Sequence, residues 1–309
     1  NKGEVKLDNL EITVLDEADQ MADMGFLPVV KEILDQAKPN GQRMLFSATL
    51  DRDVDSLVKK YLKDPKVHSL HSEKSAVATM EHYVLIIKPQ DKEEILAEIA
   101  SRHGKTIIFV KTQRGADRVA DTLMHAGVPA GALHGGKSQA VRTRMLKNFK
   151  ESPDSVLVAT DVAARGIHVD GISLVVHADP AQSHKDYLHR SGRTARAGES
   201  GVVVSIAPVR QRKSISSLVA RAGVTATQVE VSSLSPELVK ITGARKPSGI
   251  PYVPPKEEKP KQGRARRGGP SRGRSSGESR GRGSRDSRSS RDGSRDNRGS
   301  RDGGRSRSK

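Results

Sequence analysis

The chain has 309 residues, enough for about two domains, and it contains no cysteine. The absence of cysteine excludes disulfides, thiolate zinc sites and cysteine nucleophiles. The longest apolar runs are far shorter than the ~20 residues that cross a bilayer, so we expect a soluble, cytoplasmic protein without membrane contact. The net charge of +17 favours a polyanionic partner, because Lys and Arg neutralise phosphates.

Short β-type runs alternate with helical patterns between Leu10 and Ala222, which is typical of βαβ units in a parallel sheet. The sequence therefore predicts an α/β fold. Between the runs, apolar residues recur at the spacing of one helix face, and we interpret these stripes as core. The predicted strands are Ile12–Leu15, Met44–Ser47, His82–Ile87, Thr106–Val110, Ala130–Leu133, Val156–Ala159, Leu174–His177 and Gly201–Ala207.

Changes in composition divide the chain into five parts. Residues 1–70 hold only two predicted strands, too few for a complete domain, and residues 71–79 are polar and small, as in a linker. Residues 80–225 hold a complete α/β set, and residues 226–255 form an extension. Residues 256–309 contain 19 Lys and Arg against 7 Asp and Glu, mostly in Arg-Gly, Arg-Ser and Arg-Asp repeats, and predict a disordered basic tail.

The basic tail fits RNA or DNA better than an acidic protein. We expect it to act as a nonspecific RNA tether that binds phosphates and depends strongly on salt. No aromatic residue follows Tyr252, so the tail cannot stack bases on aromatic rings. The alternative is a solubilising segment.

An apolar strand that ends in carboxylates, Ile12–Leu15 followed by Asp16 and Glu17, has the Walker B arrangement of nucleoside triphosphatases. Such a strand can aim one carboxylate at a Mg²⁺ ion that bridges phosphates and the next at an attacking water. Spacing alone is weak evidence, because acidic residues often end strands at the solvent.

Further motifs make the assignment specific. The chain resembles DEAD-box ATP-dependent RNA helicases of the bacterial type over about residues 1–225. The matching strings, in the family's order, are Asp16-Glu17-Ala18-Asp19, Ser47-Ala48-Thr49, Phe109-Val110-Lys111-Thr112, Gln139 with Arg142, Ala159 to Gly166, and His189-Arg190-Ser191-Gly192-Arg193-Thr194-Ala195-Arg196.

The resemblance implies two RecA-like lobes, the first partial and the second complete, with ATP held between them. It implies that Asp16 holds Mg²⁺ through water, that Glu17 is the general base, and that Arg193 and Arg196 are arginine fingers. Asp19 completes the acidic motif. His189 would couple the last motif to these carboxylates, while Ser47, Ala48 and Thr49 would link hydrolysis to lobe closure.

The resemblance also implies RNA as the partner, held through its sugar-phosphate backbone and therefore without base specificity. We expect a monomer. The positions that match the family's RNA-binding motifs are Thr112, Gly135, Gln139, Arg142, Thr160 and Gly166.

The sequence departs from the family in two places. The phosphate-binding P-loop should precede the Walker B strand, but only fifteen residues precede Asp16, so we expect an inactive N-terminal truncation without ATP turnover. His168 stands where the family has Asp against the nucleotide ribose. A histidine can still form a hydrogen bond with a hydroxyl, but its charge changes near neutral pH. His168 is therefore an altered nucleotide contact, or else a surface residue without functional consequence.

A second phosphate-loop pattern, Gly131 to Ser138, matches Walker A spacing. We interpret it as a chance match, because Gly131 falls inside a predicted strand rather than after it. Lys137 would be its phosphate-binding residue if this interpretation were wrong.

Two other functions remain open. The chain could be an ATP-independent RNA-binding or annealing module, which would bind RNA without hydrolysing ATP. A DNA helicase with the same two-lobed core is disfavoured, because the literal DEAD and Ser-Ala-Thr strings favour the RNA branch. The remaining histidines predict no metal site, because they lack partner cysteines.

Overall fold

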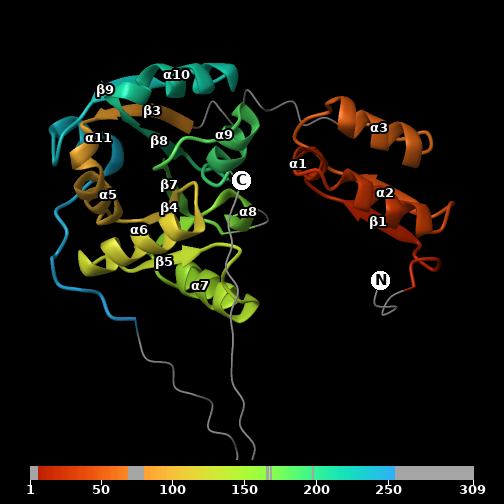
Figure 1. Cartoon of the computed structure of the whole chain (residues 1–309), viewed down its shortest axis with the longest axis horizontal. Coiled ribbons are helices and arrows are strands. Elements are labelled where there is room, and N and C mark those ends of the chain that lie inside the picture. The colour runs from red at the N-terminus through yellow and green to blue at the C-terminus, as the bar shows by residue number, and fades with distance from the viewer. Residues whose placement is uncertain (1–5, 69–79, 165–166, 168, 197, 255–309) are drawn as a thin grey trace, which may run out of the picture. The chain divides into compact units, whose positions relative to one another are not determined.

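The computed structural model describes residues 6–68, 80–164, 167, 169–196 and 198–254 (Figure 1). These residues belong to the first of two units, Asn1–Pro255 and Lys256–Lys309. The predicted linker at residues 71–79 and the predicted tail lie outside the described residues, as do Gly166 and His168. The described residues contain no helix long and apolar enough to cross a membrane.

The first segment, residues 6–68, is a small α/β piece. Strands β1 (Ile12–Leu15) and β2 (Gln42–Leu45) pair in parallel, with Ile12 opposite Gln42. Helices α1 (Ala18–Asp23), α2 (Leu27–Gln36) and α3 (Arg52–Tyr61) complete it. Its core contains Val30, Leu34, Leu57 and Tyr61. Ile12 and Val14 point away from this core and are more than half exposed, so one face of β1 is uncovered in the described residues.

The second segment, residues 80–254, is built on a seven-stranded sheet in the order β5-β6-β4-β7-β8-β3-β9. Every neighbouring pair is parallel. All strands therefore end at the same edge of the sheet, and loops after different strands meet there. The strands are β3 (Met80–Ile87), β4 (Lys105–Phe109), β5 (Ala130–Leu133), β6 (Val156–Ala159), β7 (Ile172–His177), β8 (Gly201–Pro208) and β9 (Thr227–Glu230).

Helices cover both faces of this sheet. One core cluster joins the sheet to α5 (Lys92–Ala100), α6 (Gln113–His125) and α11 (Pro236–Thr242). The other joins it to α7 (Gln139–Glu151), α8 (Asp161–Ala164), α9 (His184–Ser191) and α10 (Arg212–Arg221). Successive residues of β4 face opposite clusters, so the strand is apolar on both sides. The 3₁₀ turns η1 (Pro89–Asp91) and η2 (Val209–Gln211) precede α5 and α10.

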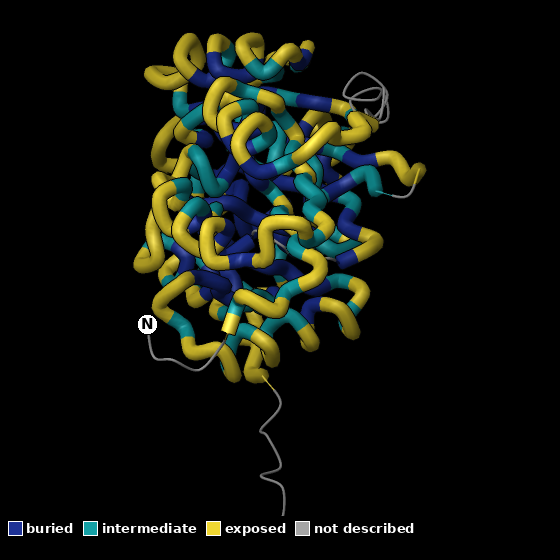
Figure 2. Tube along the Cα trace, turned by 90° about the vertical axis from the view of Figure 1, so that its right-hand side faces the viewer, coloured by how far each residue is buried: buried dark blue, intermediate teal, exposed yellow. Residues whose placement is uncertain are grey.

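Buried positions gather in the strands and on the inner sides of the helices, while the outer turns are exposed (Figure 2). The predicted α/β class with parallel sheets is thus confirmed. Strands β1, β5 and β6 begin and end where the sequence predicts. Strand β2 begins and ends two residues earlier than predicted.

The last part of the second segment, from β9 onward, packs on the rest of that segment. Strand β9 pairs with β3, and Leu238 of α11 is fully buried. Glu98 of α5 is also buried, and its carboxylate accepts hydrogen bonds from the Ser233 hydroxyl and the Leu234 N–H. We call residues 244–254 the C-terminal strap.

The C-terminal strap lies against the end of α6. Gly249 N–H donates to the Ala126 carbonyl at 3.0 Å, and Tyr252 N–H donates to the Met124 carbonyl at 2.8 Å. These carbonyls lie at a helix C-terminus, where no later helical residue can donate to them, and that of Met124 also accepts the Gly127 N–H at 3.0 Å. A Cβ on Gly127 would come within 2.0 Å of the Ser248 hydroxyl and 2.7 Å of the Ile250 carbonyl oxygen. Glycine at position 127 therefore lets the strap approach.

Two buried histidines predict an acid-sensitive fold. His82 lies in the core with Nδ1 2.8 Å from the Tyr187 hydroxyl, and burial lowers the pKa of His82 to about 4. Burial, aided by the charge of Arg190, also lowers the pKa of His177 well below its ordinary value. Below pH ~6.5 the unfolded chain binds more protons than the folded chain, so the free energy of unfolding should fall as the pH drops toward 4. For His82 the expected fall is about 3 kcal/mol.

Urea unfolding at several pH values should show this dependence, and His82→Gln, which cannot titrate, should weaken it. His125→Gln is the matched control, because His125 is exposed on α6. Equal pH dependence in His82→Gln and the unaltered chain would contradict the prediction.

Candidate functional site

The acidic motif follows β1 directly. Asp16 is exposed, and one of its carboxylate oxygens accepts the Glu17 N–H at 2.9 Å. Glu17 lies at the N-terminus of α1 with a left-handed backbone, φ 51°, which is unfavourable for a residue with a Cβ. The Glu17 carbonyl accepts hydrogen bonds from the N–H groups of Gln20 and Met21, and these bonds hold this conformation. Strain of this kind often occurs at functional positions.

Asp19 joins the acidic motif to the Ser-Ala-Thr motif after β2. Its buried carboxylate accepts hydrogen bonds from the Thr49 N–H at 3.1 Å and the Thr49 hydroxyl at 3.0 Å. Ser47 accepts the Asp19 N–H at 3.1 Å and donates to the Thr49 carbonyl at 2.7 Å. The parallel pairing of β1 and β2 brings these residues together. Ala48, whose methyl group can neither donate nor accept a hydrogen bond, separates Ser47 from Thr49.

Helix α9 presents the last motif. Ser183 and Asp186 form a capping box that fixes where the helix begins. His189 lies in its last turn, with Nδ1 3.2 Å from the Gln20 amide and Nε2 3.8 Å from an Asp19 carboxylate oxygen. Arg193 follows the helix, and its guanidinium lies 3.7 Å from the Glu17 carboxylate. The described structure thus brings three of the predicted motifs together.

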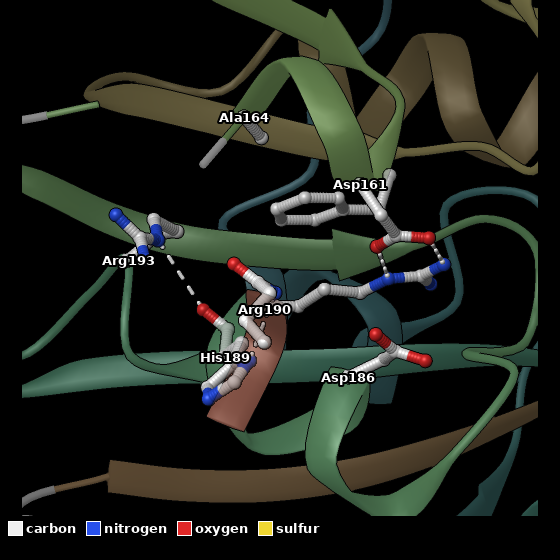
Figure 3. A pocket seen from close by; sticks show the side chains of 8 residues that line it. Asp161, Ala164, Asp186, His189, Arg190 and Arg193 are labelled. Atoms are coloured by element: carbon white, nitrogen blue, oxygen red, sulfur yellow. Dashed lines mark hydrogen bonds and ion pairs between the residues drawn. The ribbon is translucent and has the colours of Figure 1, made fainter. Parts of the chain in front are cut away.

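Arg193 and Arg196 are held by backbone carbonyls. Arg193 donates to the His189 carbonyl at 3.2 Å (Figure 3). It also donates to the Ile167 carbonyl at 3.1 Å. Arg196 donates to the carbonyls of Gly192 at 2.9 Å and Ile167 at 3.4 Å. Both guanidinium groups therefore donate to one carbonyl, so their positive charges lie close together.

Two contacts at this site involve residues that sequence reasoning missed. Arg190, 2% exposed, forms a two-point ion pair with Asp161, with distances of 2.5 and 2.8 Å (Figure 3). Its third nitrogen donates to the Asp179 carbonyl, and its guanidinium lies 5.1 Å from the Phe109 ring centre. Arg190 and Asp161 both stand inside the motif strings of the family, so the signal for them was present.

Lys185, also missed, lies 2.6 Å from Asp51 and 3.2 Å from Asp23. Hydrogen bonding to Asp51 raises the pKa of Lys185, and the same contact lowers the pKa of Asp51. Nothing in a lone sequence pairs residues so far apart in the chain.

The predicted RNA-binding residues lie after three neighbouring strands. Thr112 follows β4 and caps α6 by accepting the Gly115 N–H at 3.0 Å. Gly135 follows β5, and a Cβ there would meet only the Gln113 amide at 3.7 Å, so packing does not require glycine. Gln139 and Arg142 share a hydrogen bond in the first turn of α7, at 3.2 Å, and Thr160 follows β6. Sheet order β5-β6-β4 places all of them at one edge.

The Walker A look-alike is not built as a phosphate loop. Gly131 lies within β5, and Ser138 caps α7 by accepting the Val141 N–H. Lys137 pairs with Asp117 at 2.8 Å, and this contact is the main cause of a lowered pKa of Asp117. Among the described residues, no group of three or more His, Cys, Asp or Glu could hold a metal ion.

The doubly covered parallel sheet and the joined motifs have the arrangement of a RecA-like helicase core. Two family models match the chain: "DEAD/DEAH box helicase" over residues 1–57 and "Helicase conserved C-terminal domain" over residues 91–198. The chain belongs to the DEAD-box helicase family.

Among its relatives is the ATP-dependent RNA helicase RhlB of Pseudomonas syringae pv. tomato, 40% identical over 67% of this chain and 53% of the relative. Another is the ATP-dependent RNA helicase DBP2 of Debaryomyces hansenii, 41% identical over 66% of this chain and 39% of the relative. The chain therefore spans about half the length of RhlB.

A solved structure, "S. cerevisiae Dbp5 bound to RNA and ADP BeF3", is 30% identical over 73% of this chain and 61% of that chain, with a TM-score of 0.66. The likeness is one of fold as well as sequence, and Dbp5 was solved with RNA and a nucleotide bound.

Proposed function

We propose that the chain carries the hydrolytic and RNA-binding parts of an ATP-dependent RNA helicase, in which ATP hydrolysis is coupled to local unwinding of RNA duplexes. The observation that carries this proposal is the network joining Asp19, Thr49 and His189, with Arg193 beside Glu17. It connects three motifs whose side chains have no other evident reason to meet.

The residues present fit Mg²⁺ and a nucleotide. Asp16 is an exposed carboxylate with one oxygen occupied by its neighbour's N–H, which leaves the other able to bind a hydrated cation. Arg193 and Arg196 offer fixed positive charge from one side. Bound Mg²⁺ and ATP supply a phosphoryl group activated for transfer to water. His168, whose position is not described, remains a proposed ribose contact.

The chain's own residues supply the proton and charge chemistry. Glu17 accepts the proton of the attacking water, and its carboxylate lies at the strained turn where β1 ends. Arg193 and Arg196 stabilise negative charge that grows during the transfer. His189 and Gln20 connect α9 to the acidic motif, and Ser47 and Thr49 hold Asp19, so that hydrogen bonds link α9 to both motifs.

RNA is proposed to lie along the carboxyl edge of β5, β6 and β4, where Thr112, Gly135, Gln139, Arg142 and Thr160 gather. Thr112 and Thr160 would offer hydroxyl and backbone groups, and Arg142 a charge, to the sugar-phosphate backbone. Such contacts bind without reading bases.

The test is to join the chain behind the upstream half of RhlB and to measure ATP hydrolysis with and without RNA. Hydrolysis that rises with RNA, together with release of a strand from a short duplex, supports the proposal. A folded, RNA-binding hybrid with no RNA-stimulated hydrolysis would contradict it.

The second candidate, ATP-independent RNA binding, is favoured by one observation. The Walker A look-alike is engaged elsewhere, since Lys137 pairs with Asp117 and Gly131 lies in β5. We expect the 309-residue chain by itself to bind RNA without ATP turnover. Turnover in this chain that disappears in Lys137→Ala would overturn that expectation and restore the look-alike as a nucleotide site.

The basic tail, residues 256–309, is proposed to tether RNA near the lobe. Deleting it should weaken RNA binding about equally for unrelated sequences and flatten the salt dependence, because each lost phosphate contact removes about 0.7 from the slope of log affinity against log salt. Titrations at several ionic strengths measure both effects. Equal affinity and equal slope with and without the tail would leave it as a solubility element.

A further inference from the structure

Four exposed cations gather after strands β3 and β8, and we call them the β3–β8 basic patch: Lys88, Arg210, Arg212 and Lys213. Lys88 directly follows β3, and the other three lie in η2 and the start of α10, directly after β8. The two strands are neighbours, and Ile87 pairs with Pro208, so Lys88 leaves the sheet beside Val209. The loops that carry the four charges are therefore adjacent.

No ion pair compensates the charge of this patch in the described residues, although Asp91 follows Lys88 by three residues and Glu230 ends the neighbouring strand β9. In the described part of the chain, Lys88, Arg210 and Lys213 form no ion pair, and Arg212 donates to the neutral Gln228 side chain at 2.8 Å. The sequence has no Asp or Glu from residue 200 to residue 229. By contrast, nearby Lys92 is paired with Asp179 at 2.9 Å.

The charges do not serve the fold. Arg212 and Lys213 stand in the first turn of α10, where no acidic residue is present. A cation at this end of a helix opposes the helix dipole. Two adjacent cations there cost stability, and in the described structure neither of them is paired with a carboxylate. A ligand with negative charge would offset this cost.

The position of the patch indicates which ligand. All strands of the sheet end at the same edge, and the predicted RNA-binding residues follow β5, β6 and β4. Only β7 separates β4 from β8, so the patch begins about 10 Å from the end of β4 at the usual strand spacing. Asp179, the acidic side chain in the loop between β7 and α9, accepts the Lys111 N–H and pairs with Lys92, so its charge is neutralised.

We propose that the β3–β8 basic patch binds phosphates of the same RNA that lies on β5, β6 and β4, and so extends the RNA-binding edge across about five strand spacings, or roughly 24 Å. This inference rests on the proposed RNA-binding function. The patch contains no aromatic side chain for base stacking, so the added contacts are electrostatic and independent of sequence.

The test compares two triple variants of the full chain that carry the same net charge. Lys88→Gln/Arg210→Gln/Lys213→Gln removes three patch cations. Lys150→Gln/Lys240→Gln/Lys246→Gln is the control; it removes three exposed lysines at the ends of α7 and α11 and in the C-terminal strap. Binding of two unrelated single-stranded RNA oligonucleotides is titrated at several salt concentrations, and circular dichroism checks that each variant is folded.

The patch variant should lower the slope of log affinity against log salt by about 2, since each of three lost contacts removes about 0.7. It should also weaken binding of both RNAs by about tenfold or more at ~0.1 M salt. The control should change both quantities much less. If the unaltered chain binds no RNA, the proposed function fails. If it binds RNA and the two variants behave alike, the proposal for the patch is overturned and the patch serves another partner.

Discussion

Arg190→Ala is expected to lower the free energy of unfolding of the second segment by about 3–5 kcal/mol, because it removes a buried guanidinium and leaves the partly buried carboxylate of Asp161 without its partner. Arg190 is 2% exposed and donates from all three nitrogens, to Asp161 and to the Asp179 carbonyl. It joins α9 to α8 and to the end of β7. The loss should therefore also loosen the helix that presents His189 and Arg193.

Urea unfolding, with hydrogen exchange of β4 and β7 as the local measure, tests this expectation. Lys59→Ala is the matched control, because Lys59 forms an exposed ion pair with Asp55 on α3 and surface pairs contribute little. A loss below about 1 kcal/mol in Arg190→Ala would show that the pair is not a structural anchor.

Glu17→Gln and Arg193→Ala should each reduce RNA-stimulated ATP hydrolysis by ~10³-fold or more in the hybrid with the upstream half of RhlB. Gln keeps the shape of Glu17 but cannot accept the proton of the attacking water. Ala at position 193 removes a charge that stabilises the transition state. Neither change touches the edge proposed for RNA, so RNA affinity should change little.

Steady-state hydrolysis and RNA titration of each variant measure these effects. Glu32→Gln, an exposed glutamate on α2, is the control for loss of one carboxylate and should leave hydrolysis unchanged. Turnover within tenfold of the unaltered hybrid in either site variant would contradict the assigned role.

The sheet of the second segment was predictable because its strands are apolar on both faces. Strand β6 is buried at all four positions, and such runs stand out in a sequence. Strand β9 was not predicted. Its residues Thr227–Glu230 are mostly exposed and polar, and it is a strand only because the edge of β3 offers it hydrogen bonds. Helix α11 is a short helix that begins at Pro236, and its one buried apolar residue, Leu238, gives too weak a periodic signal.

The motif strings placed the candidate site on the chain, and the resemblance implied that His189 couples to the acidic motif, but the individual contacts do not follow from local sequence. Local spacing puts Asp16, Glu17 and Asp19 at the end of one strand. The contact of Asp19 with Thr49 depends on the pairing of β1 with β2, and that of His189 with Gln20 joins residues 169 positions apart. Such contacts are set by tertiary packing, which leaves no mark in the local sequence.

Strand β9, near the end of the second segment, also protects this segment against self-association. Strand β3, eight residues long and apolar, would be the outermost strand if β9 did not pair with it. A bare edge of this length is a template for pairing with another chain. The short, mostly polar β9 takes that place and ends in Glu230, while the buried Glu98 holds the turn that follows. A protein shortened to residue 225 would therefore be expected to aggregate, however complete its catalytic motifs.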